Sequence, residues 1–398
     1  MSGLFWPGDH RAGSAMSEAA FFEALLAAEN AWLATLVAAG VAPSTAAADL
    51  GALVERADLD EIAAGAERDG NPVTGLVAML RSRAGGDAAR WLHRGLTSQD
   101  VLDTALMLCL RDAVAKVRGD VIAQVHRLVA LIETRGAAPM LTHTLTQPAL
   151  PGTAGGKFAI WLTAVLDAAD TLDALPPQAV SAGGAAGTLA ATTELTGSPQ
   201  AAIALTEQWA AALGLAPATP WHTTRSPITR TGDAFVGCCD AWGHIANDVA
   251  AGVRTGELAE GTGGGSSTMP HKNNPVLTVL LRRAALAAPP LAATLHAASA
   301  ASVDERADGG WHAEWATLAT LARRTVVAAS QATELLTGLQ FDSARATANQ
   351  AAAQGIYDEQ QTMSTLVGKP PAPDYLGATE ALVDAAVRRA HQYLKETS

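Results

Sequence analysis

Cysteine is scarce in this sequence of 398 residues, and its three copies are badly placed for cross-linking. Cys238 and Cys239 are adjacent and Cys109 stands alone, so no even set supports a disulfide framework. None of the three has the spacing from histidines that a zinc site requires. The first ten residues also lack the basic and apolar regions of a signal peptide. We therefore expect a protein of the reducing cytoplasm.

Positive charge is also in deficit. Lysine and arginine number 27 against 39 aspartates and glutamates, which gives a net charge of −12. This excess argues against nucleic acid or an anionic membrane as a partner. An anionic substrate would need a local cluster of cations to overcome the overall field. Because the sequence contains no dinucleotide fingerprint, P-loop or metal-ligand cluster, we expect neither a cofactor nor a metal.

Long apolar runs and convincing strand alternation are missing as well. Charges and glycines interrupt the alanine-rich stretches, so the sequence predicts no transmembrane helix. Apolar residues instead recur at helical spacing, and tyrosine and phenylalanine are few. The pattern predicts an all-α protein of long, near-antiparallel packed helices. The expected long helices cover 18–39, 73–83, 102–117, 157–175, 242–253, a stretch after 275, and 314–337.

One segment concentrates reactive groups: Gly264 to Pro275, which reads Gly-Gly-Ser-Ser-Thr-Met-Pro-His-Lys-Asn-Asn-Pro. Its glycines allow backbone N–H groups to approach a ligand. Asn274 followed by Pro275 predicts an N-cap and the first turn of a helix, whose positive end would face the segment. This arrangement suits an anion whose charge grows during a reaction. For the glycine-serine part alone, a flexible linker is the alternative interpretation.

The string Ser-Ser-x-Met-Pro-x-Lys-x-Asn at 266–274 resembles the signature of the fumarase/aspartase superfamily. This superfamily includes argininosuccinate lyase, adenylosuccinate lyase and 3-carboxy-cis,cis-muconate cycloisomerase. His-Arg-Gly-Leu-Thr-Ser at 93–98 resembles its substrate loop, although Thr97 and Asp100 also fit a helix capping box. The resemblance is convincing from about residue 70 to 345. It implies an N-terminal helical domain, a central long-helix domain and a shortened C-terminal domain, with bounds 1–92, 93–338 and 339–398.

Three further segments resemble the cycloisomerase branch: 99–104, 221–225 and 310–315. The segment 183–188 resembles both that branch and the adenylosuccinate lyases. Each has a plain structural alternative, such as close packing of glycines or a buried tryptophan pair. The segment 142–151 departs from the superfamily pattern. His143 replaces its arginine, and Leu145 replaces a histidine thought to assist proton transfer in two of the lyases. Because leucine has no exchangeable proton, this departure weakens those lyase interpretations. His143 is either structural or a substitute donor.

The resemblance also implies roles for individual residues. Ser266 would be the acid/base group, activated by Lys272 and nearby backbone amides. The remaining groups would bind substrate carboxylates: His93, Thr97, Ser98, His143, Thr144, Gln147, Arg225, Ser267, Met269, Asn274 and Arg306.

The implied reaction is the cofactor-free lactonisation of a tricarboxylate, 3-carboxy-cis,cis-muconate, in protocatechuate breakdown. The resemblance further implies a homotetramer in which three chains build each site. Two alternatives stay open. One is an adenylosuccinate-lyase-like enzyme that releases fumarate. The other is a non-enzymatic structural homologue, which the shortened C-terminal domain keeps in consideration.

Overall fold

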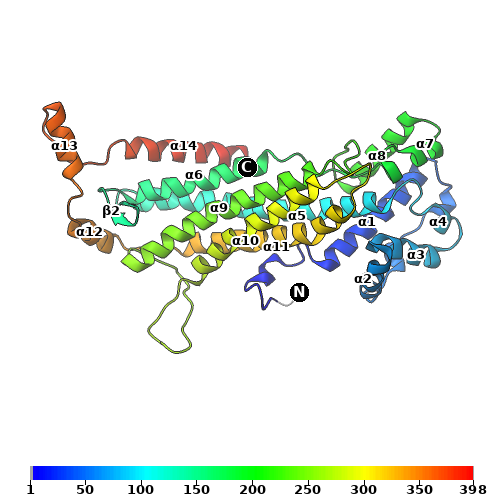
Figure 1. Ribbon diagram of the computed structural model, residues 1–398, viewed down its shortest axis with the longest axis horizontal. Helices are drawn as coiled ribbons and strands as arrows, with labels where there is room; N and C mark the ends of the chain where they lie inside the picture. Colours follow the sequence, from blue (N-terminus) through cyan, green and yellow to red (C-terminus); the bar gives the residue numbers. More distant parts are fainter. Residues whose placement is uncertain (1–2, 398) are drawn as a thin grey trace.

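The computed structural model describes residues 3–397 as an elongated molecule made mostly of helices (Figure 1). Strands among these residues are four two-residue pieces, paired into two short antiparallel ladders. The all-α prediction is therefore confirmed for the described part of the chain.

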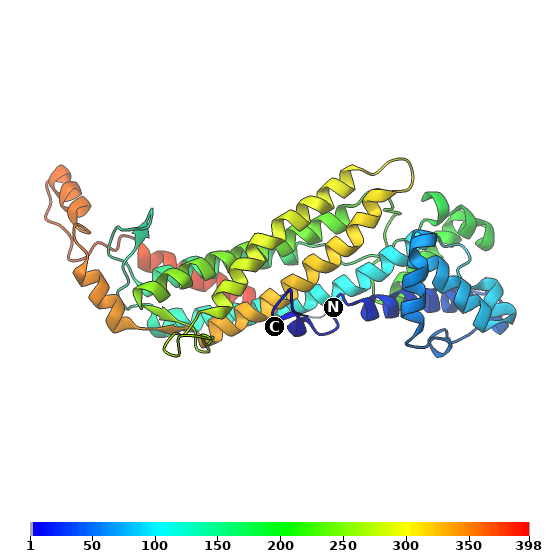
Figure 2. The same ribbon diagram turned by 60° about the horizontal axis from the view of Figure 1, so that its bottom comes forward.

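Five long helices lie side by side and form the body of the molecule (Figures 1 and 2). They are α5 (Ser98–Arg135), α6 (Ala154–Asp173), α9 (Ser226–Thr255), α10 (Val276–Ala300) and α11 (Gly309–Gly338). All five were expected from the sequence, but α5 and α9 are longer than predicted. Helix α5 continues through Gly119 because Val121, Val125 and Leu128 keep the helical spacing and are buried.

The five helices are not all antiparallel to one another. Each reverses the direction of the one before it along the chain, so α5, α9 and α11 run the same way (Figure 1). Contacts along α5 and α11 confirm this. Near the two N-termini the indole N–H of Trp311 donates to Asp103 at 2.9 Å, and further along Gln124 donates to the carbonyl of Ala329 at 3.1 Å. The bundle therefore has one end where α5, α9 and α11 begin and another where they end.

Helix α5 is enclosed on every side at its start. From Gln99 to Leu110 every residue is buried, and four of them are polar. A helix face normally alternates between core and solvent, so continuous burial means that other elements surround this segment. Its polar side chains must be satisfied by hydrogen bonds inside the protein.

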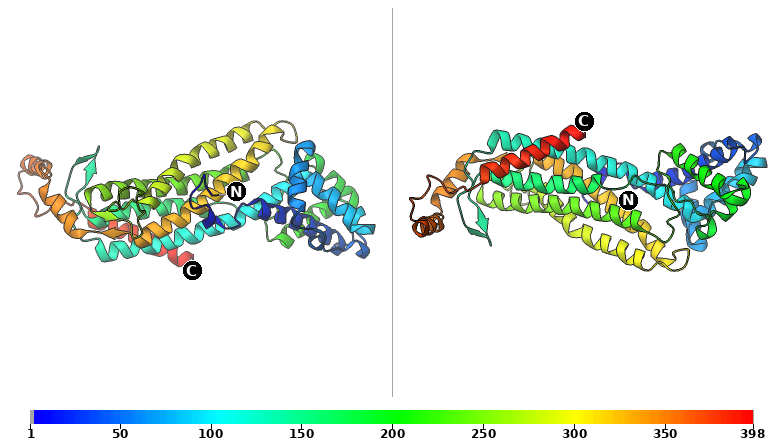
Figure 3. Two further views of the ribbon diagram at one scale, coloured as in Figure 1. Left: turned by 90° about the horizontal axis from the view of Figure 1, so that it is seen from below. Right: turned by 90° about the horizontal axis from the view of Figure 1, so that it is seen from above.

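Smaller helices lie at the end of the bundle where α5 begins (Figure 1). They are α1 (Glu18–Ala38), α2 (Asp58–Asp69), α3 (Pro72–Ala84), α4 (Gly86–Trp91), α7 (Ala190–Thr196) and α8 (Pro199–Leu213), with short 3-10 turns η2 (Ser44–Ala46), η3 (Gly51–Leu53) and η4 (Gly184–Ala186). Contacts cross the predicted boundary at residue 92 in both directions. Trp209 of α8 donates to the carbonyl of Ala28 in α1 at 3.0 Å. Conversely, the turn η1 (Asp9–Ala12), close to the N-terminus in Figure 3, lies against the middle of the bundle. Arg323 of α11 binds Asp9 there at 2.7 Å.

The opposite end of the bundle carries the strands and the C-terminal helices. The strands are β1 (His143–Thr144) with β2 (Gln147–Pro148), and β3 (Leu258–Ala259) with β4 (Gln340–Phe341). The helices are α12 (Ser343–Ala352), α13 (Asp358–Val367) and α14 (Thr379–Glu396). Helices α12 and α13 extend away from the bundle, and α14 returns along α6 (Figure 1). Arg389 of α14 holds it there through Asp167 and Asp170 at 2.7 and 2.8 Å.

Two helices, α1 and α10, are long and apolar enough to cross a membrane by length and composition, with mean hydropathies of 1.3 and 1.4. Helix α1 packs against α5 and α8, and α10 packs against α9 and α11. We therefore interpret both as bundle helices. All three cysteines are free and buried, and burial raises the pKa of Cys109 and Cys239 to about 12, so these thiols stay protonated and unreactive.

Candidate functional site

The serine loop, residues 261–275, projects from the bundle between α9 and α10 (Figure 1). Its two arms meet at Gly264 and Asn274, whose backbone N–H and C=O groups exchange two hydrogen bonds of 2.8 Å. A side chain at Gly264 would overlap Val276, so this glycine permits close approach of the two arms. The sequence therefore forms a closed loop and not an open linker.

The reactive groups of the serine loop face outward within one chain. Ser266 is half-buried, and its Oγ accepts a hydrogen bond from the N–H of Met269 at 3.1 Å. Ser267, Met269 and Lys272 are exposed, and the Lys272 amine has no hydrogen-bond or ion-pair partner among residues 3–397. The Asn274 amide donates across the loop to a backbone oxygen at 3.2 Å. These groups are gathered in one segment, but a single chain leaves them open to solvent.

The N-terminus of α10 differs from the sequence prediction. Helix α10 begins at Val276, with Pro275 in the cap position and no capping bond from Asn274. The buried carboxylate of Glu260 instead accepts from the N–H groups of Leu277 at 3.1 Å and Thr278 at 2.6 Å. The positive end of this helix is therefore already neutralised by the protein's own anion, and the prediction that it faces a substrate anion is wrong in this arrangement.

Because Glu260 precedes the serine loop and its partners follow it, this carboxylate fastens the base of the loop. We expect Glu260→Ala to lower the free energy of unfolding by about 1 kcal/mol or more, the usual cost of losing a cap. The amides of Leu277 and Thr278 should exchange with deuterium faster. Glu260→Gln, which keeps one acceptor, is the matched control and should show a smaller change. Unchanged amide exchange in Glu260→Ala would contradict this role.

The Thr97–Ser98 segment lies at the other end of the bundle, where Asp100 connects three loops. The Asp100 carboxylate is fully buried and accepts from the backbone N–H of Thr97 at 2.9 Å, which is part of the expected capping box. It also accepts from the N–H groups of Gly183 at 2.9 Å and Gly184 at 3.0 Å, and contacts His222 Nε2 at 2.6 Å. The segments 183–188 and 221–225 are thus held beside the substrate loop by one side chain.

Arg225 does bind carboxylates, but they belong to the protein. Its guanidinium contacts Asp103 at 2.7 Å and Glu314 at 2.6 Å, and its side chain is fully buried. Burial alone would lower the pKa of Arg225, but the two carboxylates raise it, so the guanidinium stays charged. Its donors are used, and the expectation that Arg225 binds a substrate carboxylate is corrected to a structural role. Removing one member of such a buried ion pair typically lowers the free energy of unfolding by about 3–5 kcal/mol.

His93 and Arg306 lie at the same end of the bundle as Thr97 and Ser98. His93 is half-buried in the loop that leads into α5, and its ring contacts Glu29 of α1. Arg306 is exposed in the loop that joins α10 to α11, visible at the upper right of Figure 2. The start of α11 also touches the N-terminal helices, because His312 Nε2 contacts the carbonyl of Gly70 at 2.8 Å.

His143, Thr144 and Gln147 form a small hairpin beyond the end of α5. Its register pairs His143 with Pro148 and Thr144 with Gln147, and all these residues are exposed. The turn is made by Leu145 and Thr146, both with positive φ, which is uncommon for residues other than glycine. Leu145 is 95% exposed, so an apolar side chain stands in solvent at the tip of a strained turn.

One chain does not bring the predicted site residues together. The serine loop lies at the end of the bundle where α11 finishes, because Gly261 packs against Gly338. The hairpin follows the C-terminus of α5 at the same end (Figure 1). Thr97, Ser98 and Arg306 lie at the opposite end. Helix α5 has 38 residues, which places its two ends roughly 55 Å apart. One chain alone therefore does not assemble the predicted residues into one site.

The buried ionic groups near the start of α5 were missed as functional candidates in the sequence. They are Asp100, Asp103, His222 and Glu314, and each stands inside a segment that resembles the cycloisomerase branch. The available signal was the spacing of Asp100 and Asp103 among apolar positions of one helix, since a carboxylate on a buried face needs a partner. The sequence did not say which distant residue supplies that partner.

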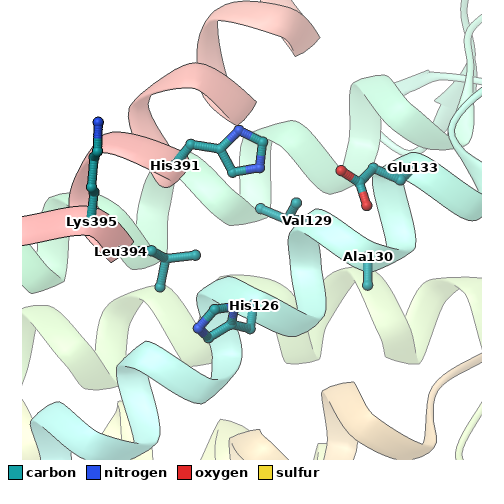
Figure 4. Close-up of a pocket in the computed structure, with 7 residues that line it drawn as sticks. All are labelled: His126, Val129, Ala130, Glu133, His391, Leu394 and Lys395. Atoms are coloured by element: carbon teal, nitrogen blue, oxygen red, sulfur yellow. The ribbon is translucent and has the colours of Figure 1, made fainter. Parts of the chain in front are cut away.

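A surface groove of about 450 Å³ between α5 and α14 contains none of the predicted site residues (Figure 4). It is lined by His126, Val129, Ala130, Glu133, His391, Leu394 and Lys395. Within residues 3–397 no group of three or more histidine, cysteine, aspartate or glutamate side chains has the arrangement of a metal site.

Comparison of the sequence with known proteins gives three informative similarities. A protein-family model described as a lyase matches residues 14–288. A nitrosuccinate lyase of Streptomyces davaonensis is 42% identical over 411 residues, covering 97% of this chain and 85% of the relative. A 3-carboxy-cis,cis-muconate cycloisomerase of Bradyrhizobium diazoefficiens is 36% identical over 383 residues, covering 93% of this chain and 81% of the relative.

The fold is similar to that of the 3-carboxy-cis,cis-muconate lactonizing enzyme from Pseudomonas putida. The two structures superpose with a TM-score of 0.85 at 27% sequence identity, covering 98% of this chain and 100% of the other. The similarity includes the long-helix body and both ends of the bundle, where the predicted site residues lie.

Proposed function

This chain belongs to the fumarase/aspartase lyase family and is a lyase-type enzyme, and on that premise we propose that it is a 3-carboxy-cis,cis-muconate cycloisomerase of protocatechuate breakdown. The observation that carries this proposal is the fold match over essentially the whole chain to a lactonizing enzyme. It is supported by the cycloisomerase relatives and by the segments 221–225 and 310–315, which pack together around Arg225.

In the proposed reaction, one carboxylate of the substrate adds to the diene of the same molecule. A C–O bond forms, the electron pair of the double bond moves toward a second carboxylate, and Ser266 protonates the resulting α-carbon. The product is a lactone, and the net reaction takes up one proton. The charged intermediate is the difficult species, so donors aimed at it supply most of the catalysis.

Ser266 and Lys272 are assigned to this step because they share one loop, with the serine hydroxyl near a backbone N–H and the amine unpaired. The remaining carboxylates are assigned to Thr97, Ser98, Thr144, Gln147 and Asn274. Ser267 and Met269 complete the wall of the carboxylate site. His93, His143 and Arg306 are assigned as further groups that contact the substrate carboxylates, in place of Arg225. No cofactor takes part in this scheme.

A specific observation favours a second candidate, elimination of nitrite from nitrosuccinate. The relative named for that substrate matches 97% of this chain. Because Arg225 is paired with Asp103 and Glu314, it is not free to bind a substrate carboxylate. The cations that remain match a substrate with two carboxylates better than one with three. The chemistry is related, because a base removes a proton α to one carboxylate and the nitro group leaves with its bonding pair. The organic product would be fumarate.

A side-by-side assay separates these candidates. We expect purified enzyme, with chelator and no added cofactor, to consume 3-carboxy-cis,cis-muconate, measured as loss of ultraviolet absorbance. Nitrite release from nitrosuccinate and fumarate release from adenylosuccinate are measured in parallel. A higher kcat/KM for nitrosuccinate would replace the proposal with the second candidate. If adenylosuccinate is the one substrate consumed, the enzyme is an adenylosuccinate-lyase-like eliminase and the cycloisomerase proposal is wrong.

We further propose a cytoplasmic homotetramer with sites shared between chains. Helix α10 supports this, since only 33% of its most apolar window is buried within one chain. Val279 and Leu286 are 56% and 80% exposed on it. An apolar face of this kind is normally covered by another protein surface. Packing four copies along their long helices would bring opposite bundle ends of different chains together.

A further inference from the structure

Glu29 and His93 form a pair that the sequence did not suggest. His93 Nδ1 lies 2.5 Å from Glu29 Oε1, across a separation of 64 positions in the chain. The Glu29 side chain is completely buried in α1, whereas 15% of the His93 side chain is exposed. A buried carboxylate thus stands directly behind a histidine that is open on its other side.

The loop that carries His93 is held firmly by its surroundings. The indole N–H of Trp32, one turn along α1 from Glu29, donates to the carbonyl of Arg94 at 2.7 Å. Arg81 of α3 donates to the carbonyl of Leu92 at 2.9 Å. His93 itself has a φ of 61°, a conformation that costs free energy in a residue with a side chain. Such a conformation persists only when neighbouring contacts impose it, so the imidazole position is set from several sides.

The charge of Glu29 has one direct partner. Its Oε2 is buried without a hydrogen-bond partner among residues 3–397, and Oε1 contacts His93. Arg81 also interacts with Glu29 through charge, but its guanidinium donates its hydrogen bond to the carbonyl of Leu92. A buried carboxylate is costly unless it is paired, so the bond to His93 is the contact that stabilises it.

This geometry determines which nitrogen of His93 is available. The contact between Glu29 and Nδ1 fixes the orientation of the ring. Nε2 lies on the opposite side of the ring, and none of the described residues bonds to it. His93 is four residues before Thr97, in the loop assigned to carboxylate binding.

We propose that Glu29 is a positioning residue that holds His93 with Nε2 directed at a substrate carboxylate. Glu29 acts through His93 and does not touch the substrate. The contact occupies Nδ1 and leaves Nε2 free, at the site where the donors of Arg225 are committed to Asp103 and Glu314. The inference rests on the proposed function in one respect, namely that the ligand is a di- or tricarboxylate.

The test is a double-mutant cycle read by binding. Calorimetric titration measures the Kd of propane-1,2,3-tricarboxylate for the tetramer of wild type, Glu29→Gln, His93→Asn and the double variant. Asparagine is chosen because it tolerates positive φ. We expect Glu29→Gln to weaken binding about tenfold, the lower end for carboxylates that orient a working histidine. The double variant should be no weaker than His93→Asn alone, because Glu29 has nothing left to position.

Controls separate this role from a general loss of structure. Glu23→Gln changes an exposed carboxylate on the same helix and should leave binding unchanged. Trp32→Phe weakens the hold on the same loop but leaves the Glu29–His93 contact in place, so its effect on the Kd should be smaller than that of Glu29→Gln. If Glu29→Gln does not fold, Glu29→Asp replaces it in the cycle.

If the fold-changes in Kd caused by Glu29→Gln and His93→Asn multiply in the double variant, the two residues act independently and the inference is wrong. A wild-type enzyme that does not bind the tricarboxylate would also overturn it. The proposed reaction is judged separately, by lactone formation. A wild type that binds the tricarboxylate with the expected coupling but forms no lactone would refute the reaction and keep the Glu29–His93 assignment.

Discussion

Replacing Ser266 with alanine is expected to lower kcat by about a hundredfold or more, the scale of losing an acid/base group. The hydroxyl is the proposed proton donor, and its loss removes no buried contact of the bundle. The Ser266 hydroxyl accepts a hydrogen bond from the N–H of Met269 at 3.1 Å, and Met269 is exposed. The melting temperature and the oligomer size should therefore stay at the wild-type values. Steady-state kinetics, thermal unfolding and light scattering provide the three measurements.

Ser267→Ala is the matched control for this experiment. Ser267 is adjacent in the chain, belongs to the same loop and is exposed. Since it is assigned to carboxylate binding, its loss should raise KM and change kcat less. If Ser266→Ala keeps most of its kcat, the proton comes from another group. A large loss of kcat confined to Ser267→Ala would transfer the acid/base role to that hydroxyl.

Mixing two inactive variants is expected to restore activity. One variant is Ser266→Ala, and the other carries alanine at both Thr97 and Ser98. These positions lie at opposite ends of a bundle whose helix α5 is roughly 55 Å long, so one chain cannot supply both to one site. After mild dissociation and reassembly in equal amounts, about a quarter of the sites should receive both intact segments if chains mix at random. The specific activity of the mixture should therefore rise toward about a quarter of the wild-type value.

The control mixture combines Ser266→Ala with Lys272→Ala. Both changes lie in the serine loop, so every site receives a loop with one defect, and no recovery is expected. Native mass spectrometry establishes that mixed tetramers have formed in both mixtures. Mixed tetramers that stay inactive in the first mixture would mean that the serine loop and the Thr97–Ser98 segment act within one chain. The shared site would then be wrong.

The two predictions depend on different levels of structure. Ser266 and Lys272 are six positions apart in one loop, so their proximity follows from the sequence alone. The meeting of that loop with Thr97 and Ser98 depends on how whole chains pack. Failure of the mixing experiment would therefore leave the role of Ser266 intact.

The long helices could be predicted because their cause is local. Apolar residues at spacings of three and four place one face of each helix in the core, whatever lies opposite. The bounds were less certain, as α5 shows, since a helix ends where capping and packing stop favouring it. The serine loop could be identified for a similar reason, because its glycines, hydroxyls and lysine are contiguous.

The electrostatic partners could not be predicted in this way. Arg225 was a reasonable candidate for substrate binding until the fold brought Asp103 and Glu314 to its two edges. The positive end of α10 was a reasonable anion site until Glu260 occupied its free amides. Charge interactions depend on distance through space and not along the chain. The composition and motifs therefore determine the family and the helices, whereas the folded packing determines which charged groups remain free for a substrate.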